Sequence, residues 1–187
     1  MANRNTQGFG LIPAGTLGST PATAGQGKYK IDAGYGTTIY NGGAVTSSAG
    51  YIVEGQGTDT PILGVLNGIF YNAATTLKPT FANFYKQPIT PANSEDIDAF
   101  VYDNPQQQYV VATDAAAAQA VYLETFDMNT SAGSDTTGKS SATLDIGDTS
   151  ADAASWRLLR SAEDPENDEN AAFRSVVVVA NLIELQS

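Results

Sequence analysis

Residues 173–187 read FRSVVVVANLIELQS, and this stretch decides the fold class. Four consecutive valines at 176–179 favour an extended strand, because β-branched side chains pack well on a pleated surface. The run is apolar at successive positions, so both of its faces are apolar, as in a strand buried within a sheet. We therefore expect this segment to lie at the centre of a β-sheet.

The rest of the chain also favours strands, and no amphipathic pattern exceeds about two helical turns. A short helix is expected only over the alanines at 115–118, followed by a strand at 121–126. Short strands at near-regular spacing with turn signals predict an all-β domain, barrel-like or sandwich-like. The other strand-like stretches are KYKID (28–32), TTIY (37–40), YIVE (51–54), PILGVLNGIFYN (61–72), TLDI (143–146) and SWRLLRS (155–161).

Glycine and turn residues suggest how these strands connect. Asn41-Gly42-Gly43 is a tight-turn signal, and Gly64 and Gly68 are expected at bulges or bends. The stretch IDAFVYDNPQQQYVVA predicts a hairpin with strands at 97–102 and 109–112. Its turn would lie at Asp103-Asn104-Pro105.

Residues 1–27 differ from the rest because they are small, polar, and rich in glycine and proline. They show no helical or strand period, and such a segment cannot bury enough apolar surface to order alone. It nevertheless carries three apolar residues, Phe9, Leu11 and Ile12, which a plain linker does not need. We expect an extended N-terminal arm that docks on a neighbouring subunit, followed by a β-barrel-like domain over 28–187. A disordered tail is the alternative.

Composition narrows the range of functions. The 187 residues include no cysteine, so disulfides and thiolate metal sites are excluded, and no histidine, the most usual general base and zinc ligand. The formal net charge of −11 disfavours binding to nucleic acid. No apolar run approaches the roughly 20 residues of a membrane span. We expect no enzyme, no cofactor, no metal site, and no nucleic-acid or membrane partner, in a protein made in the cytoplasm.

The stretch GSDTTGKS, residues 133–140, matches the phosphate-binding loop pattern G-x-x-x-x-G-K-[ST]. Such a loop must follow a buried strand and open a helix whose first N–H groups point at the phosphates. The residues after Ser140, SATLDIGD, do not form a helix of any length. Asp135 would also place a carboxylate against the phosphates. The stretch is therefore interpreted as a surface loop.

Three further features have a possible chemical role. Asp96 and Asp98 share one face if their segment is a strand, and paired carboxylates can serve as an acid/base pair; edge strands also carry such charge to discourage pairing. The acidic residues at 163–170 offer oxygen ligands to Ca²⁺ but lack the spacing of a Ca²⁺ loop. The nine tyrosines are candidates for stacking on sugars or for packing on half-buried strands.

Several short motifs, taken in order, resemble a family of tailed-phage capsid decoration (cement) proteins. The resemblance covers nearly the whole chain, and the order of the motifs is more specific than any one of them. The stretches that carry it are GFGLIPAG (8–15), TPILGVLNGIFYN (60–72), DAFVYDNPQQQYVV (98–111), GKSSATLDIG (138–147) and SWRLLRSAEDPENDENAAFRSVVVVANLIELQ (155–186). The acidic turn EDPENDEN and the ending ANLIELQS depart from the family pattern.

This resemblance implies a virion structural protein on the outside of an icosahedral phage head. Its partners would be the major capsid protein and neighbouring copies of itself. It also implies that the GKS residues belong to a structural loop before a strand. Phe9, Leu11 and Ile12 are the expected contacts with the capsid or a neighbour. The alternative function is a carbohydrate-binding or adhesive β-module on the virion surface.

Overall fold

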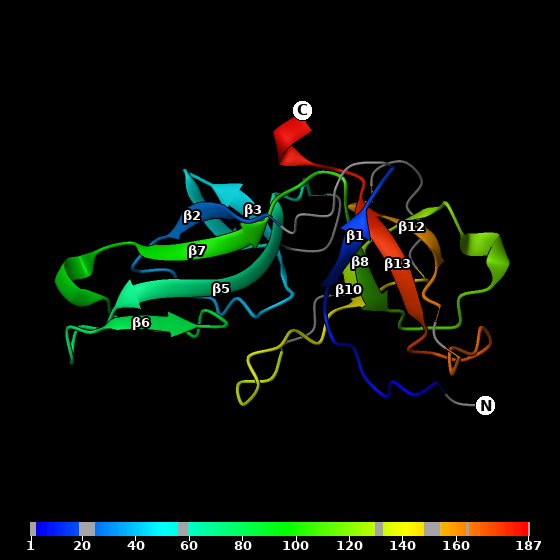
Figure 1. Ribbon diagram of the computed structural model, residues 1–187, viewed down its shortest axis with the longest axis horizontal. Coiled ribbons are helices and arrows are strands. Elements are labelled where there is room, and N and C mark those ends of the chain that lie inside the picture. Colours follow the sequence, from blue (N-terminus) through cyan, green and yellow to red (C-terminus); the bar gives the residue numbers. More distant parts are fainter. Residues whose placement is uncertain are drawn as a thin grey trace.

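The computed structural model describes residues 3–18, 25–55, 60–129, 133–147, 154–163 and 165–186. Strands account for 44% of the chain and helices for 5%, so the fold is all-β, as the sequence predicts. Three antiparallel sheets form a sandwich-like fold. The two larger sheets lie side by side along the long axis of the molecule (Figure 1).

The first sheet has the valine-rich strand at its centre. Its order is β1 (Ile12–Thr16), β8 (Gln107–Ala112), β13 (Ser175–Ala180), β12 (Trp156–Ser161) and β9 (Thr125–Phe126). Five of the six residues of β13 are buried. The central, buried position predicted from the apolar run is therefore confirmed.

The second sheet is curled. Its order is β2 (Gly27–Ile31), β7 (Ile97–Tyr102), β5 (Gly64–Asn72), β3 (Ala44–Ser48) and β4 (Tyr51–Glu54), and β6 (Pro79–Ala82) also pairs with β5. β4 comes back beside β2, so the sheet wraps around its own apolar cluster. The pairing of β5 with β7 shifts between Leu66 and Gly68, which confirms the bulge expected at Gly68.

The third sheet and the helices are short. β10 (Met128–Asn129) pairs with β11 (Thr143–Leu144), and three 3₁₀ turns lie at η1 (Ala92–Ser94), η2 (Gln119–Val121) and η3 (Glu184–Gln186). The helix expected over 115–118 is absent from this described segment. Alanine propensity alone cannot nucleate so short a helix, and the N–H of the preceding Asp114 binds the carbonyl of Leu144 instead. In the described part of the chain, no helix has the length and apolar character to cross a membrane.

The predicted hairpin at 97–112 is wrong in its pairing. Both strands exist, as β7 and β8, but β7 pairs with β2 and β5, and β8 pairs with β1 and β13. The turn between them therefore passes the chain from one sheet to the other. The strand expected at 121–126 shortens to β9, because η2 occupies its first residue.

Two apolar clusters fill the molecule, and one of them joins the sheets. The cluster inside the curled sheet includes Ile31, Ile39, Val45, Leu66, Ile69, Tyr85 and Ile97. The joining cluster combines Tyr109, Phe126, Trp156, Val176 and Val178 of the first sheet with Leu11, Ala44, Ile62 and Val65. The rings of Tyr109 and Trp156 meet edge to face, with their centroids 5.7 Å apart and their planes at 88°. The two sheets therefore share a core.

Part of the expected N-terminal arm belongs to this domain. β1 is a strand of the first sheet, and Leu11 is buried in the joining cluster. The side chain of Asn3 is also buried, and its amide donates to the carbonyl oxygens of Asp168, Ala171 and Ala172. Residues 3–16 are thus packed on the chain's own domain rather than forming a separate arm. Residues 1–2 and 19–24 of that arm lie outside the described residues.

Candidate docking site at the β1 edge

The N-terminal GFG motif is wedged between two loops from distant parts of the sequence. The N–H of Gly10 donates to Ala142 O (3.2 Å), and that of Leu11 to Gly42 O (2.8 Å). A Cβ on Gly8 would lie 2.1 Å from Ser141 O, so only glycine allows this approach. Gly10 has φ of +73°, a conformation that glycine adopts without strain. The motif glycines thus bring the chain into the seam between the sheets.

The three apolar residues predicted as contacts have different environments. Leu11 is 2% exposed and belongs to the core, so it is not accessible to a neighbouring subunit. Phe9 is partly buried, and Ile12 is 49% exposed at the start of β1. The structure therefore leaves Phe9 and Ile12 as candidate contacts and removes Leu11 from the set. Leu11 instead anchors the segment that presents them.

A groove of about 190 Å³ is lined by these three residues together with Asn41 and Gly42 and with Leu66 and Asn67 of β5. Phe9, Ile12 and Pro13 line one part of it, and Asn67 and Lys139 contribute polar groups. Its floor includes the buried side chains of Leu11 and Leu66. The groove therefore has an apolar base and a polar rim, which is the usual composition of a contact surface.

β1 is the last strand of the first sheet. It pairs with β8 on one side, and no strand among the described residues pairs with its other side. An unpaired strand edge presents N–H and C=O groups that can bind an added strand. The register of β1 shifts between Pro13 and Gly15, which limits the regular part of the edge.

The loop at 133–140 borders this groove through Lys139, and it is not a phosphate cradle. The N–H of Gly138 donates to Ser134 O (2.6 Å), and that of Ser140 to Asn41 O (2.9 Å). Backbone N–H groups that bind phosphate must be free to point at it. No helix follows either, since the next element is β11. The interpretation as a structural loop before a strand is confirmed.

The two glycines of the phosphate-loop pattern serve a packing role. A Cβ on Gly133 would lie 2.5 Å from the Tyr40 ring, and one on Gly138 would lie 2.4 Å from the Phe84 ring. These two rings stack on each other, with centroids 5.7 Å apart and planes 6° apart. The loop therefore packs directly on the Tyr40–Phe84 pair, whose chain neighbours Ile39 and Tyr85 belong to the core of the curled sheet.

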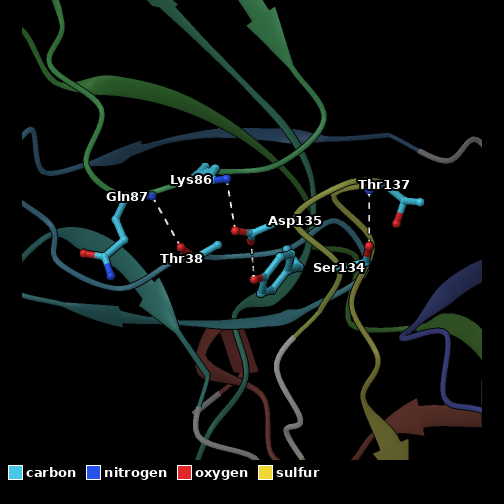
Figure 2. Close-up of polar contacts among 7 residues, drawn as sticks. Thr38, Lys86, Gln87, Ser134, Asp135 and Thr137 are labelled. Carbon is cyan, nitrogen blue, oxygen red and sulfur yellow. Dashed lines mark hydrogen bonds and ion pairs between the residues drawn. The ribbon is translucent and has the colours of Figure 1, made fainter.

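Asp135 ties the same loop to the second sheet's half by two polar contacts. Its carboxylate accepts a hydrogen bond from the Tyr40 hydroxyl (2.7 Å) and forms an ion pair with Lys86 Nζ at 3.0 Å (Figure 2). The hydrogen bond from Tyr40, followed by that from Lys86, lowers the pKa of Asp135 below its usual value. The same hydrogen bond raises the pKa of Tyr40. The Asp135 carboxylate thus fastens the loop to Tyr40 and Lys86.

Asp96 and Asp98 bind different partners in the structure. Asp98 lies on β7 and forms ion pairs with Lys28 Nζ at 2.7 Å and with Lys30 Nζ at 2.6 Å. Asp96 accepts a hydrogen bond from the Tyr51 hydroxyl at 3.2 Å. Partial burial favours a higher pKa for Asp98, but the hydrogen bonds from the two lysines outweigh it and lower the pKa. The Asp98 carboxylate thus joins β7 to β2 through its two ion pairs.

The acidic segment at 163–170 shows no metal-binding arrangement in its described part. Within the ranges that the structure describes, no three acidic, His or Cys side chains converge as a metal site. Asp164 lies outside those ranges. The Asn167 side chain instead organises this turn, since its amide donates to Ser175 O (2.7 Å) and its oxygen accepts the Ser175 N–H (2.8 Å).

Comparison with known proteins finds no matching family model, no matching curated protein and no matching solved structure. The candidate site therefore rests on the geometry of this chain. Sequence reasoning missed Tyr40, Phe84 and Lys86 as partners of the 133–140 loop. The available signal was the pair of pattern glycines, because a glycine is often needed where a ring approaches the backbone closely.

Proposed function

We propose that this protein is a virion structural protein that binds the outer surface of an icosahedral phage head and bridges neighbouring capsid subunits. The observation that carries the proposal is the β1 edge, where the exposed Ile12 and the partly buried Phe9 adjoin a groove. The order of motifs that resembles capsid decoration proteins supports the same function.

The mechanism is multivalent binding. A strand or arm of the major capsid protein packs along the outer edge of β1, and Phe9 and Ile12 cover part of its apolar side chains. Each contact is modest, but the lattice repeats it, and bridging two subunits raises the effective concentration of the second contact. The chain has a net charge of −11, which suits an exterior position better than the DNA-filled interior.

The rigid mounting of the edge supports this mechanism. Leu11 is fixed in the shared core, and the N–H groups of Gly10 and Leu11 are bound to Ala142 and Gly42. A preorganised edge loses little conformational entropy on binding, so more of the contact energy contributes to affinity. The same segment that presents Ile12 therefore also reduces the cost of docking.

Co-sedimentation with purified empty heads of the encoding phage tests the proposal. Ile12→Asp places a charge where an apolar contact is expected, so it should reduce retention on heads several fold. Leu123→Asp is the matched control, because Leu123 is exposed to 63% and lies away from β1 between η2 and β9. Absence of wild-type binding, or equal retention of Ile12→Asp and wild type, would contradict the proposal.

A further inference from the structure

The outer face of the curled sheet carries a compact group of three phenylalanines. In the register of the sheet, Phe70 on β5 lies opposite Phe81 on β6 and opposite Asp98 on β7. Phe100 lies two residues after Asp98, on the same face of β7. The intervening residue Ala99 points inward and is fully buried. We call Phe70, Phe81 and Phe100 the aromatic face.

The aromatic face is open to solvent at Phe81, on β6. Phe81 is 64% exposed, and its ring centroid lies 5.9 Å from that of Phe100, with the planes tilted by 34°. Gly68 lies opposite Phe100, and a Cβ there would come within 3.1 Å of the Phe81 ring. The Phe81 ring therefore lies over Gly68 and beside Phe100, in space that a side chain at position 68 would occupy. β5, β6 and β7 run side by side beneath this face (Figure 1).

A polar hollow of about 280 Å³ adjoins the aromatic face. It begins at Phe70 and Asp98 and extends to Asn72, Glu95 and Asp96. Its volume is close to the lower end of the ~300–1,000 Å³ range of small-molecule sites. Carboxylate oxygens and an amide thus lie directly beside exposed aromatic rings.

Hydrogen-bond donors border the same region. Lys28 and Lys30 project from β2 on the same face, and both bind the Asp98 carboxylate. Their side chains remain 59% and 50% exposed. A ligand that spans the rings and the hollow therefore meets ammonium donors, carboxylate acceptors and the Asn72 amide, which can both donate and accept hydrogen bonds.

We propose that the aromatic face and its hollow bind a neutral carbohydrate. A sugar ring has an apolar C–H face that packs on aromatic rings, and its hydroxyls both donate and accept hydrogen bonds. Those hydroxyls satisfy the carboxylates and the lysines together. A purely apolar partner would leave these charged groups desolvated and unpaired, which is costly.

The site lies on the second sheet, whereas the capsid contact proposed above lies on the edge of the first. The carbohydrate proposal does not depend on capsid binding, and either can fail without the other. Together they would let one face of the protein hold the particle while the other binds a glycan.

Saturation-transfer NMR with a panel of neutral hexose oligomers of α and β linkage tests the proposal on the full chain. We expect at least one oligomer to bind with a Kd of about 1 mM or tighter. Phe81→Ala removes the most exposed ring, so the affinity should fall about tenfold. Leu77→Ala is the matched control, because Leu77 is 73% exposed in the turn before β6 and lies outside the hollow.

Asp96→Asn provides a second variant that keeps the shape of the hollow while removing a charge. It should weaken the same oligomer while leaving the melting temperature close to that of wild type. Failure of every oligomer to bind, or equal loss of binding in Phe81→Ala and Leu77→Ala, would overturn the proposal. Capsid retention that requires Phe81 without any sugar binding would also overturn it, because the face would then be a protein interface.

Discussion

Replacing Leu11 by alanine tests whether the N-terminal segment belongs to the folded core. Leu11 is 2% exposed and packs in the cluster shared by the two sheets. Removing a buried leucine side chain to alanine costs about 2–5 kcal/mol, through lost burial and the cavity left behind. For a chain of this size, that loss lowers the melting temperature by roughly 4–20 °C.

The neighbouring residue provides the control. Ile12 is 49% exposed on the edge strand, so Ile12→Ala removes much less buried surface and should cost about 1 kcal/mol or less. Urea denaturation followed by circular dichroism gives both free energies of unfolding. The slope against urea should stay the same in both variants, because neither changes the surface exposed on unfolding by much.

Leu11→Ala and Ile12→Ala would give the same result if the N-terminal segment were not part of the core. An arm that orders only on a neighbouring subunit would make Leu11→Ala as harmless as Ile12→Ala in the isolated protein. Equal and small losses in the two variants would therefore refute the placement of Leu11 in the core. They would also remove the preorganised mounting on which the docking mechanism depends.

Three further variants test other parts of the structure. Val177→Asp buries an unpaired carboxylate on the central strand, where Val177 is 2% exposed, so it should cost several kcal/mol and give insoluble or unfolded protein; wild-type melting would disprove the strand order. Lys139→Ala should leave melting unchanged because the side chain is exposed, and calorimetry should show no ATP binding; micromolar binding lost in the variant would restore the phosphate-loop interpretation. Lys28 and Lys30 hold the pKa of Asp98 below its ordinary 3.8, so the stabilisation is present above that pH and is lost as the pH falls through the folded-state value. Asp98→Asn should therefore flatten the decline of stability below about pH 4, as measured by melting against pH; an unchanged decline would show that the pair is not responsible.

The central strand was predictable because its signal is local and unambiguous. Four consecutive valines can only be accommodated where both faces are covered, and β13 has that position. The pairing of the two strands at 97–112, in contrast, could not be predicted from local sequence signals. The turn residues between them are present, and Gln107 N–H does bind Asn104 O (2.9 Å), yet the strands join different sheets. Their partners, β2, β5, β1 and β13, lie far away in sequence, and a turn signal carries no information about them.

The candidate site shows the same limit. Ile12 was identifiable as an apolar residue in a polar segment, and it is exposed at the β1 edge. Leu11 carried the same signal but is buried, because two distant loops hold this segment: Gly42 O accepts the Leu11 N–H, and Ala142 O accepts the N–H of the preceding Gly10. Glycine-rich composition indicated a lack of order at residues 8–10, whereas the structure uses those glycines for close packing. Composition cannot separate these two uses of glycine.

Cryo-electron microscopy of empty heads incubated with the purified protein tests the proposed function most directly. The account predicts regular density on the outer surface of the shell that fits the two-sheet domain. The β1 edge and Ile12 should face the major capsid protein across a junction between subunits. Heads without added density, or bound copies whose β1 edge points away from the shell, would contradict the account.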